Sequence, residues 1–114
     1  MIGGVQGRSG FCYRRLDSVT GAWIRLPEER WQHIHREHPE LDGLYEHVLT
    51  MIENPWKVLA GSRGELLAIK EVALGKFLVV VYKEINPYDG FVITAFLTRR
   101  IKQLEKKVVV WPRQ

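Results

Sequence analysis

The segment from Phe77 to Val81, which Tyr82 follows, places the strongest constraint on the fold because it is apolar at every position. Successive side chains of a β-strand point to opposite faces. A strand with this composition is typical of a central position in a sheet that is covered on both faces. The run is far shorter than the ~20 residues of a membrane-spanning helix, so we expect no membrane association.

Strand-like segments also lie on both sides of this run. The turn Asn86–Gly90 follows it, and Pro87 presets its own φ there while Gly90 tolerates a positive φ. Residues 64–97 therefore predict a three-stranded antiparallel meander. The further segments with strand character are 56–60, 65–74, 91–97 and 108–111.

The segment Glu28–Leu41 contains three of the four histidines and predicts a helix. At about 100° per residue its apolar residues and two of its histidines share one arc of about 100°. Pro39 disfavours helical geometry at His38, so the helix should end there. The residues on the arc are Trp31, Ile34, His35 and His38.

A second helix is predicted from Gly43 to about Glu53. Asp42 is its expected N-cap, and the Asn54-Pro55 pair ends it. Its apolar side chains recur at helical spacing, so this helix should bury one face. They are Leu44, Val48, Met51 and Ile52.

The two ends of the chain complete the predicted fold. Segments 11–16 and 22–26 flank turn-forming residues and predict a hairpin. Thr98 is expected to cap a short basic helix whose inward residues are Ile101 and Leu104. We therefore predict an α+β fold with an N-terminal hairpin, two helices packed on an antiparallel sheet of about four strands, and a short basic helix near the C-terminus.

The length of 114 residues allows one hydrophobic core and predicts a single domain over 1–114, with its core at about 11–111. Cys12 is the only cysteine, so no intrachain disulfide can form and a cytoplasmic location is expected. The first ten residues have no apolar core of a secretion signal.

The net charge of +4 is concentrated near the C-terminus. Beyond residue 97, Glu105 is the only acidic residue among six basic ones. Such a segment attracts RNA or DNA, or an acidic protein partner; the alternative is a solvated tail. The basic residues are Arg99, Arg100, Lys102, Lys106, Lys107 and Arg113.

His35 and His38 are the candidates for acid/base chemistry, because they lie at a helix end beside the core. The alternative is a structural histidine that the helix dipole favours. A metal site is not expected, because His33 and His35 lie about 160° apart around a helix and the pair His35 and His38 lacks a placed third ligand. The alternative third ligands are Glu37, Glu40 and His47.

Histidine combined with fixed positive charge suits phosphodiester cleavage by the 2′-hydroxyl of RNA, which needs proton exchange and stabilisation of the phosphorane but no metal. Lys70 could bind phosphate, as could Arg99 and Arg100. Thr94 should share a strand face with Val92, Phe96 and Thr98, so two hydroxyls would align. The alternatives are β-propensity for the threonines and a local ion pair for Lys70. Thr94 and Thr98 are the candidate hydrogen-bond donors.

Four segments together resemble one known family. ERWQHIHREHPEL, a helix ending in MIENP, FLVVVY and GFVITAFLTRRIKQL resemble the phage-type branch of the barnase/EndoU/colicin/RelE-like nuclease superfamily over about residues 22–111. The resemblance implies a four-stranded antiparallel sheet, a metal-independent ribonuclease site without a cofactor, and service as a toxin with a cognate antitoxin or immunity protein. The catalytic residues that it implies are His38, Lys70, Thr94 and Arg99.

The function expected from the sequence is an endoribonuclease that acts on tRNA or mRNA. The alternatives are a non-catalytic nucleic-acid or protein binding module of the same fold, and a partner-binding protein with no nucleic-acid role. The sequence predicts no particular oligomeric state. The residues expected to bind RNA are His35, Thr98, Arg100 and Lys102.

Overall fold

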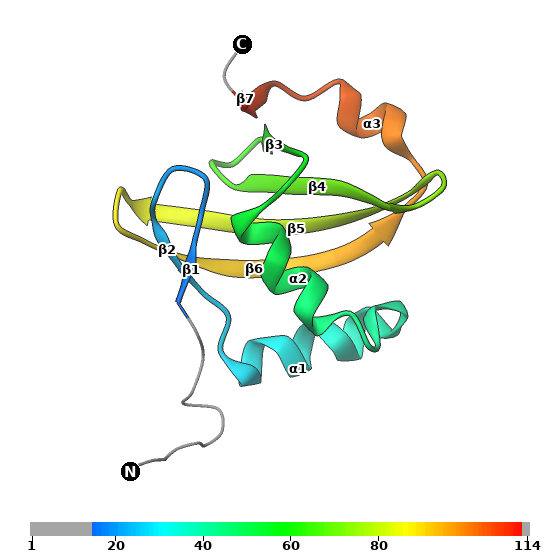
Figure 1. Ribbon diagram of the computed structural model, residues 1–114, viewed down its shortest axis with the longest axis horizontal. Helices are drawn as coiled ribbons and strands as arrows, with labels where there is room; N and C mark the ends of the chain where they lie inside the picture. Colours follow the sequence, from blue (N-terminus) through cyan, green and yellow to red (C-terminus); the bar gives the residue numbers. More distant parts are fainter. Residues whose placement is uncertain (1–14, 113–114) are drawn as a thin grey trace.

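The computed structural model describes residues 15–112. Residues 11–14 of the predicted hairpin, with Cys12, and the basic residue Arg113 lie outside this range. One sheet and three α-helices form the described part (Figure 1). The strands are β1 Leu16–Asp17, β2 Trp23–Arg25, β3 Lys57–Ala60, β4 Leu66–Ala73, β5 Lys76–Asn86, β6 Asp89–Thr98 and β7 Val109–Trp111.

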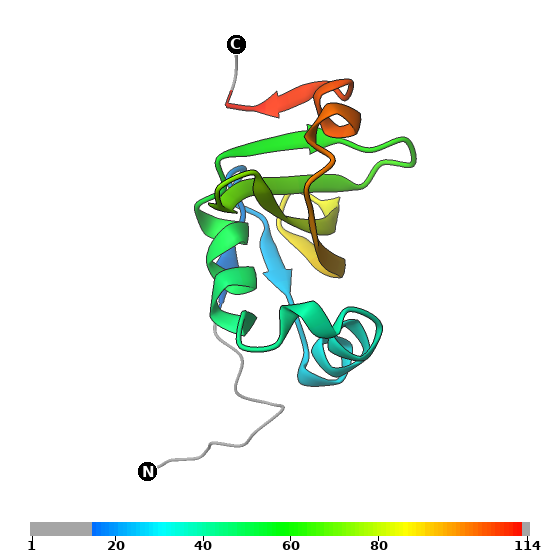
Figure 2. The ribbon, with the colours of Figure 1, turned by 90° about the vertical axis from the view of Figure 1, so that its right-hand side faces the viewer.

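The prediction of an antiparallel sheet of about four strands is wrong. The sheet has seven strands in the order β1-β2-β6-β5-β4-β3-β7, and it is mixed because β2 runs parallel to β6. It curls into a half-barrel (Figure 2). The hairpin extends the sheet because β2 pairs along the start of β6, with Ile24 opposite Gly90. At the other end β3 and β7 add the last two strands.

The meander predicted over residues 64–97 is present as β4, β5 and β6, which pair antiparallel. The apolar run lies in β5, in the centre of the sheet. Leu78 and Tyr82 belong to a core on the side of α1 and α2, whereas Val79 belongs to a second core on the side of α3. Both faces of the central strand are therefore covered, as its composition predicts.

Helix α1, Glu28–Glu37, ends at His38 as predicted, and a 3-10 helix, η3 Pro39–Leu41, follows it. Helix α2, Tyr45–Glu53, begins two residues later than predicted, and Asp42 is not its N-cap. The 3-10 helix η3 begins at Pro39, and Asp42 is its C-cap. The carboxylate then pairs with a side chain of α1.

Helices α2 and α3 lie on opposite faces of the sheet, and α1 lies beside β6 (Figure 2). Buried residues of α1, η3 and α2 fill the larger core, including Ile34, Leu41 and Ile52. Helix α3, Ile101–Glu105, buries Leu104 against the other face. The smaller core of buried residues on that face comprises Leu59, Leu67, Ile69, Val79 and Leu104.

Position 90 requires glycine because there is no space for a side chain, and not because its φ is positive. The glycines with positive φ in residues 15–112 are Gly21, Gly43, Gly64 and Gly75. Gly90 lies in β6 between β2 and β5. A Cβ at this position would overlap the backbone carbonyl oxygen of Lys83 and lie 2.7 Å from Cδ1 of Ile24. The missing side chain therefore allows the hairpin to pack against the sheet.

Candidate active site

The second half of β6 presents a half-buried face beside α3. Its residues alternate, so Thr94, Phe96 and Thr98 point to the same face. Helix α3 covers the neighbouring part of this face, where Val79 is fully buried opposite Phe96. The three β6 residues are only partly covered. We call Thr94, Phe96 and Thr98 the β6 strip.

A β-bulge determines which side chains belong to this strip. Val92 pairs with Tyr82 and Thr94 pairs with Val81, so Ile93 is an extra residue in β6. The prediction that Val92 shares a face with Thr94 is therefore wrong: Val92 is buried in the core on the helix side. Bulges commonly re-aim side chains in this way.

His38 lies at the β6 strip because α1 ends there. Its ring centroid is 6.1 Å from that of Phe96. Nδ1 of His38 lies 3.4 Å from Oε2 of Glu40, and 32% of the side chain is exposed. Nδ1 of His38 faces the carboxylate of Glu40, whereas Nε2 has no partner among residues 15–112. A histidine held at one nitrogen and free at the other is suited to exchange a proton.

The two strip hydroxyls are available but separated. Oγ1 of Thr98 accepts a hydrogen bond from the backbone N–H of Arg100 at 3.0 Å, so its own hydrogen can still be donated. Thr98 is not the N-cap of α3, which is Arg100. Thr94 makes no side-chain hydrogen bond within the described part of the chain. Four residues of strand place the two threonines about 13 Å apart, so they cannot contact the same phosphate.

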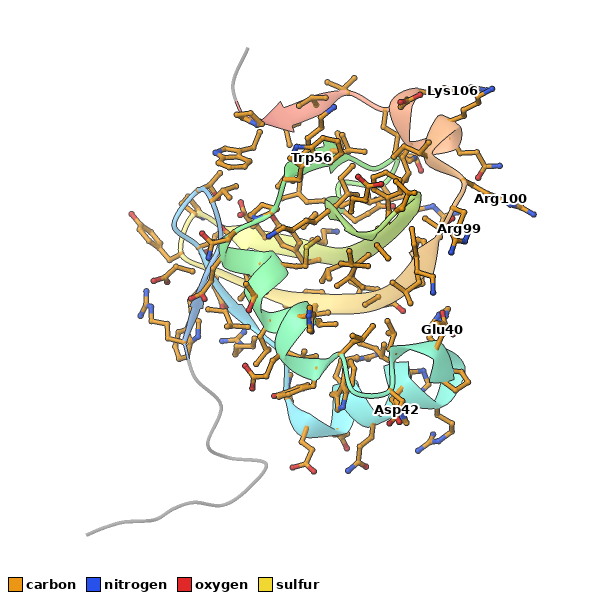
Figure 3. All side chains as sticks on the ribbon, turned by 45° about the vertical axis from the view of Figure 1, so that its right-hand side comes forward. Glu40, Asp42, Trp56, Arg99, Arg100 and Lys106 are labelled. Carbon is orange, nitrogen blue, oxygen red and sulfur yellow. The ribbon has the colours of Figure 1, made fainter. Side chains whose placement is uncertain are left out.

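The cations follow the strip at the end of β6 (Figure 3). Nη1 of Arg99 donates to the carbonyl oxygen of Leu74 at 3.1 Å and so ties this end of β6 to the β4–β5 turn. Arg100 and Lys102 are exposed, and neither makes an ion pair within residues 15–112. These side chains form a positively charged border next to Thr98.

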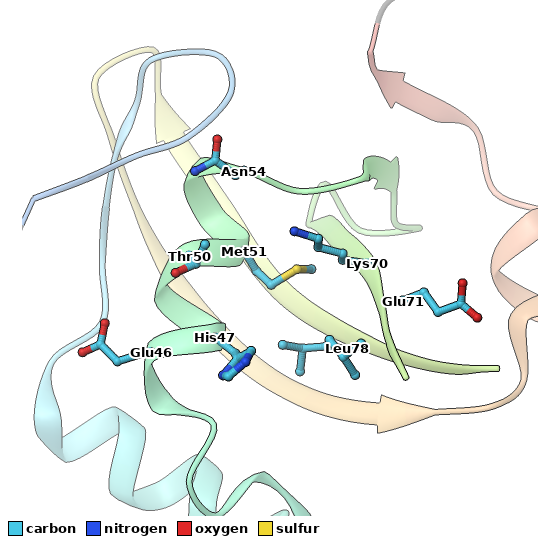
Figure 4. A pocket seen from close by; sticks show the side chains of 9 residues that line it. Glu46, His47, Thr50, Met51, Asn54, Lys70, Glu71 and Leu78 are labelled. Carbon is cyan, nitrogen blue, oxygen red and sulfur yellow. The ribbon is translucent and has the colours of Figure 1, made fainter. Parts of the chain in front are cut away.

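Lys70 does not join this cluster. It pairs with Leu78, whose side chain faces α2, and therefore points to the opposite face of the sheet. There it lines a cleft of about 360 Å³ together with His47 and Met51 of α2 (Figure 4). From the sequence, His47 was considered only as a third metal ligand. Its spacing of four residues from Met51 is the signal that places both on one helix face.

His35 is held by structural contacts. Its Nε2 lies 3.1 Å from Oδ1 of Asp42, and its ring centroid is 5.9 Å from that of Trp31. These contacts fasten the end of α1 to the link before α2, so His35 is less suited than His38 to bind a substrate.

No group of three or more histidine, cysteine, aspartate or glutamate residues in the described range is arranged to hold a metal ion. Within residues 15–112 no helix has both the length and the apolar character needed to cross a membrane.

Comparison with known proteins found no matching family model, no matching curated protein and no matching solved structure.

Proposed function

We propose that the chain is a metal-independent endoribonuclease that binds RNA along the β6 strip. The observation that carries the proposal is the contact of His38 with Phe96, between two threonines of the same strand face. The site combines His38, whose Nε2 is free, with the carboxylate of Glu40 beside Nδ1 and with hydroxyl donors on the β6 strip. Arginines border the strip on one side.

The proposed reaction is attack by the 2′-hydroxyl of RNA on the adjacent phosphorus. Nε2 of His38 takes the 2′ proton, the new O–P bond forms, and the bond to the 5′-oxygen breaks. The products are a 2′,3′-cyclic phosphate and a 5′-hydroxyl that takes its proton from water. Glu40 stabilises the resulting imidazolium. Thr98 or Thr94 and Arg99 donate hydrogen bonds to the phosphorane oxygens.

Affinity in this proposal comes from Arg99, Arg100 and Lys102, because phosphate contacts supply most of the binding free energy and make it depend on salt. An endoribonuclease would damage RNA of its own cell unless it were inhibited. We therefore propose a cognate antitoxin or immunity protein as a second partner, in keeping with the resemblance to toxin nucleases.

The alternative is a non-catalytic nucleic-acid binding module of the same fold. The position of Lys70 favours this alternative, because Lys70 belongs to the expected catalytic set but lies on the face of the sheet opposite His38 and the β6 strip. Such a module would bind RNA with a steep salt dependence but would form no product.

The test is incubation of purified protein with total RNA in excess EDTA, beside His38→Ala and His33→Ala variants of the same preparation. His33 is the matched control, because it is an exposed histidine of α1 that pairs with Glu37. We expect the wild type and His33→Ala to produce discrete fragments. His38→Ala should be slower by about 10²–10⁴-fold, as is typical of a lost acid/base group.

Circular dichroism must show that each variant is folded. Absence of cleavage by the folded wild type would reject the enzyme and leave the binding module. Loss of cleavage in His33→Ala with retention in His38→Ala would reject His38 as the acid/base group.

A further inference from the structure

Trp56 is an unusually exposed aromatic residue at the edge of the face that carries the β6 strip. It directly precedes β3, and 52% of its surface is exposed (Figure 3). Its ring is stacked on that of Phe77, with centroids 6.2 Å apart and an interplanar angle of 18°. Nζ of Lys57 lies 5.1 Å from the centroid of the Trp56 ring. The Trp56 ring is therefore stacked on Phe77 and has an ammonium group over it, while about half of the residue is open to solvent.

A cleft of about 240 Å³ adjoins this ring, between the sheet and α3. Ile69, Phe77 and Leu104 contribute apolar walls. The charged residues of the lining are Lys57, Lys107 and Glu105, so the two ammonium groups outnumber the one carboxylate. The cleft is smaller than the roughly 300–1,000 Å³ of typical ligand pockets, so it suits a single ring system. Apolar walls, an aromatic face and ammonium groups together match a planar base that is joined to a phosphate.

The strand register connects this cleft to the β6 strip. Lys57 is opposite Ile69, Ile69 is opposite Val79, and Val79 is opposite Phe96. Directly opposite residues of antiparallel strands point to the same face, and His38 contacts the last residue of this row. Three strand spacings separate the ends of the row, about 14 Å in all. A flexible single strand could therefore occupy both places.

We propose that the cleft beside Trp56 binds one unpaired base of single-stranded RNA, while a phosphate a few nucleotides away lies at His38. This inference rests on the proposed function and names its substrate class. A duplex is excluded because its bases are already stacked and paired, so none can enter the cleft without being extruded.

The test measures binding in the His38→Ala background, in which the RNA should remain intact. Fluorescence anisotropy follows a labelled single-stranded RNA of about 12 nucleotides, within the usual range of site sizes. We expect an added Trp56→Ala substitution to weaken binding by about tenfold or more, as is typical when a stacked base loses its ring. Trp56→Phe should restore most of the affinity, and Tyr88→Ala, at a turn residue that is 79% exposed, should leave it unchanged.

A series of RNAs, each with one abasic position, then identifies the stacked base. In the His38→Ala background one position should weaken binding as much as Trp56→Ala does. The same abasic RNA should cause no further loss once Trp56 is absent. Duplex RNA should bind with the same affinity whether or not Trp56 is present.

Two results would overturn the subsite: equal affinity of the Trp56→Ala and parent proteins for single strands, or a further full loss when the abasic RNA meets Trp56→Ala. Either result together with cleavage in EDTA rejects the subsite and keeps the enzyme. A Trp56-dependent and base-dependent affinity without cleavage keeps the subsite and rejects the enzyme.

Discussion

Replacing Tyr82 by phenylalanine should stabilise the protein. Tyr82 lies in β5 with 0% of its surface exposed, and its hydroxyl has no hydrogen-bond partner within residues 15–112. A buried polar group without a partner costs about 1–3 kcal/mol of stability. Phenylalanine keeps the ring and removes the hydroxyl, so we expect the free energy of unfolding to rise by about 1 kcal/mol. For a chain of this size that corresponds to an increase in Tm of about 4 °C.

The stabilisation should grow at high pH. Burial, with a smaller contribution from the nearby carboxylate of Glu84, raises the pKa of the Tyr82 hydroxyl above its ordinary value of 10.0. As the pH rises past the ordinary value, the unfolded chain releases this proton while the folded chain retains it. The wild type therefore loses stability above about pH 10, by up to about 1.4 kcal/mol per pH unit from this residue. Tyr82→Phe lacks this loss.

Urea denaturation at pH 7 and at pH 10.5 measures both effects, with Tyr88→Phe as the matched control because Tyr88 is an exposed residue of the β5–β6 turn. We expect the control to follow the wild type at both pH values. A Tyr82→Phe variant that is less stable than the wild type at pH 7 would refute the reasoning, since it would show that the hydroxyl has a favourable partner. An advantage that does not increase at pH 10.5 would refute the pKa argument.

Two further predictions concern the stability of the fold. Gly90→Ala should lower the free energy of unfolding by about 1–3 kcal/mol in urea denaturation, because its Cβ would overlap the Lys83 carbonyl; Gly61→Ala, which meets only the flexible side chain of Glu65, should cost less. Hydrogen bonds from the backbone of Glu65 itself and then from the backbone N–H of Arg63 lower the pKa of the Glu65 carboxyl. The stability that this carboxylate contributes is therefore present at neutral pH and is lost as the pH falls below about 4.5. Glu65→Gln should therefore lose less stability than the wild type in an acid titration followed by circular dichroism, and equal losses would contradict the assignment.

Local chemistry in the sequence was sufficient to predict several elements. Apolar composition identified β5 as a central strand, and the turn signals around it predicted the meander. Pro39 ended α1 at His38, which is a steric effect between neighbouring residues. The inward residues of α3, Ile101 and Leu104, followed from helical spacing alone. Each of these predictions depends on residues that are close together in the chain.

The size and mixed character of the sheet could be known only from tertiary structure. The parallel pairing of β2 with β6 joins residues more than sixty positions apart, with Ile24 opposite Gly90. No local pattern encodes such a pairing. It depends on the fit of the hairpin against a glycine of the sheet.

Long-range pairing also separated residues that the sequence had assigned to one site. The sequence placed Lys70 with Thr94 as part of one catalytic set, but the register sends Lys70 to the α2 side, and the bulge at Ile93 turns Thr94 away from Val92. A shift of one residue in strand pairing exchanges the two faces of a sheet. The sequence therefore determined which residues form strands and where α1 ends, whereas long-range pairing decided which side chains meet, because register is set by contacts between distant segments.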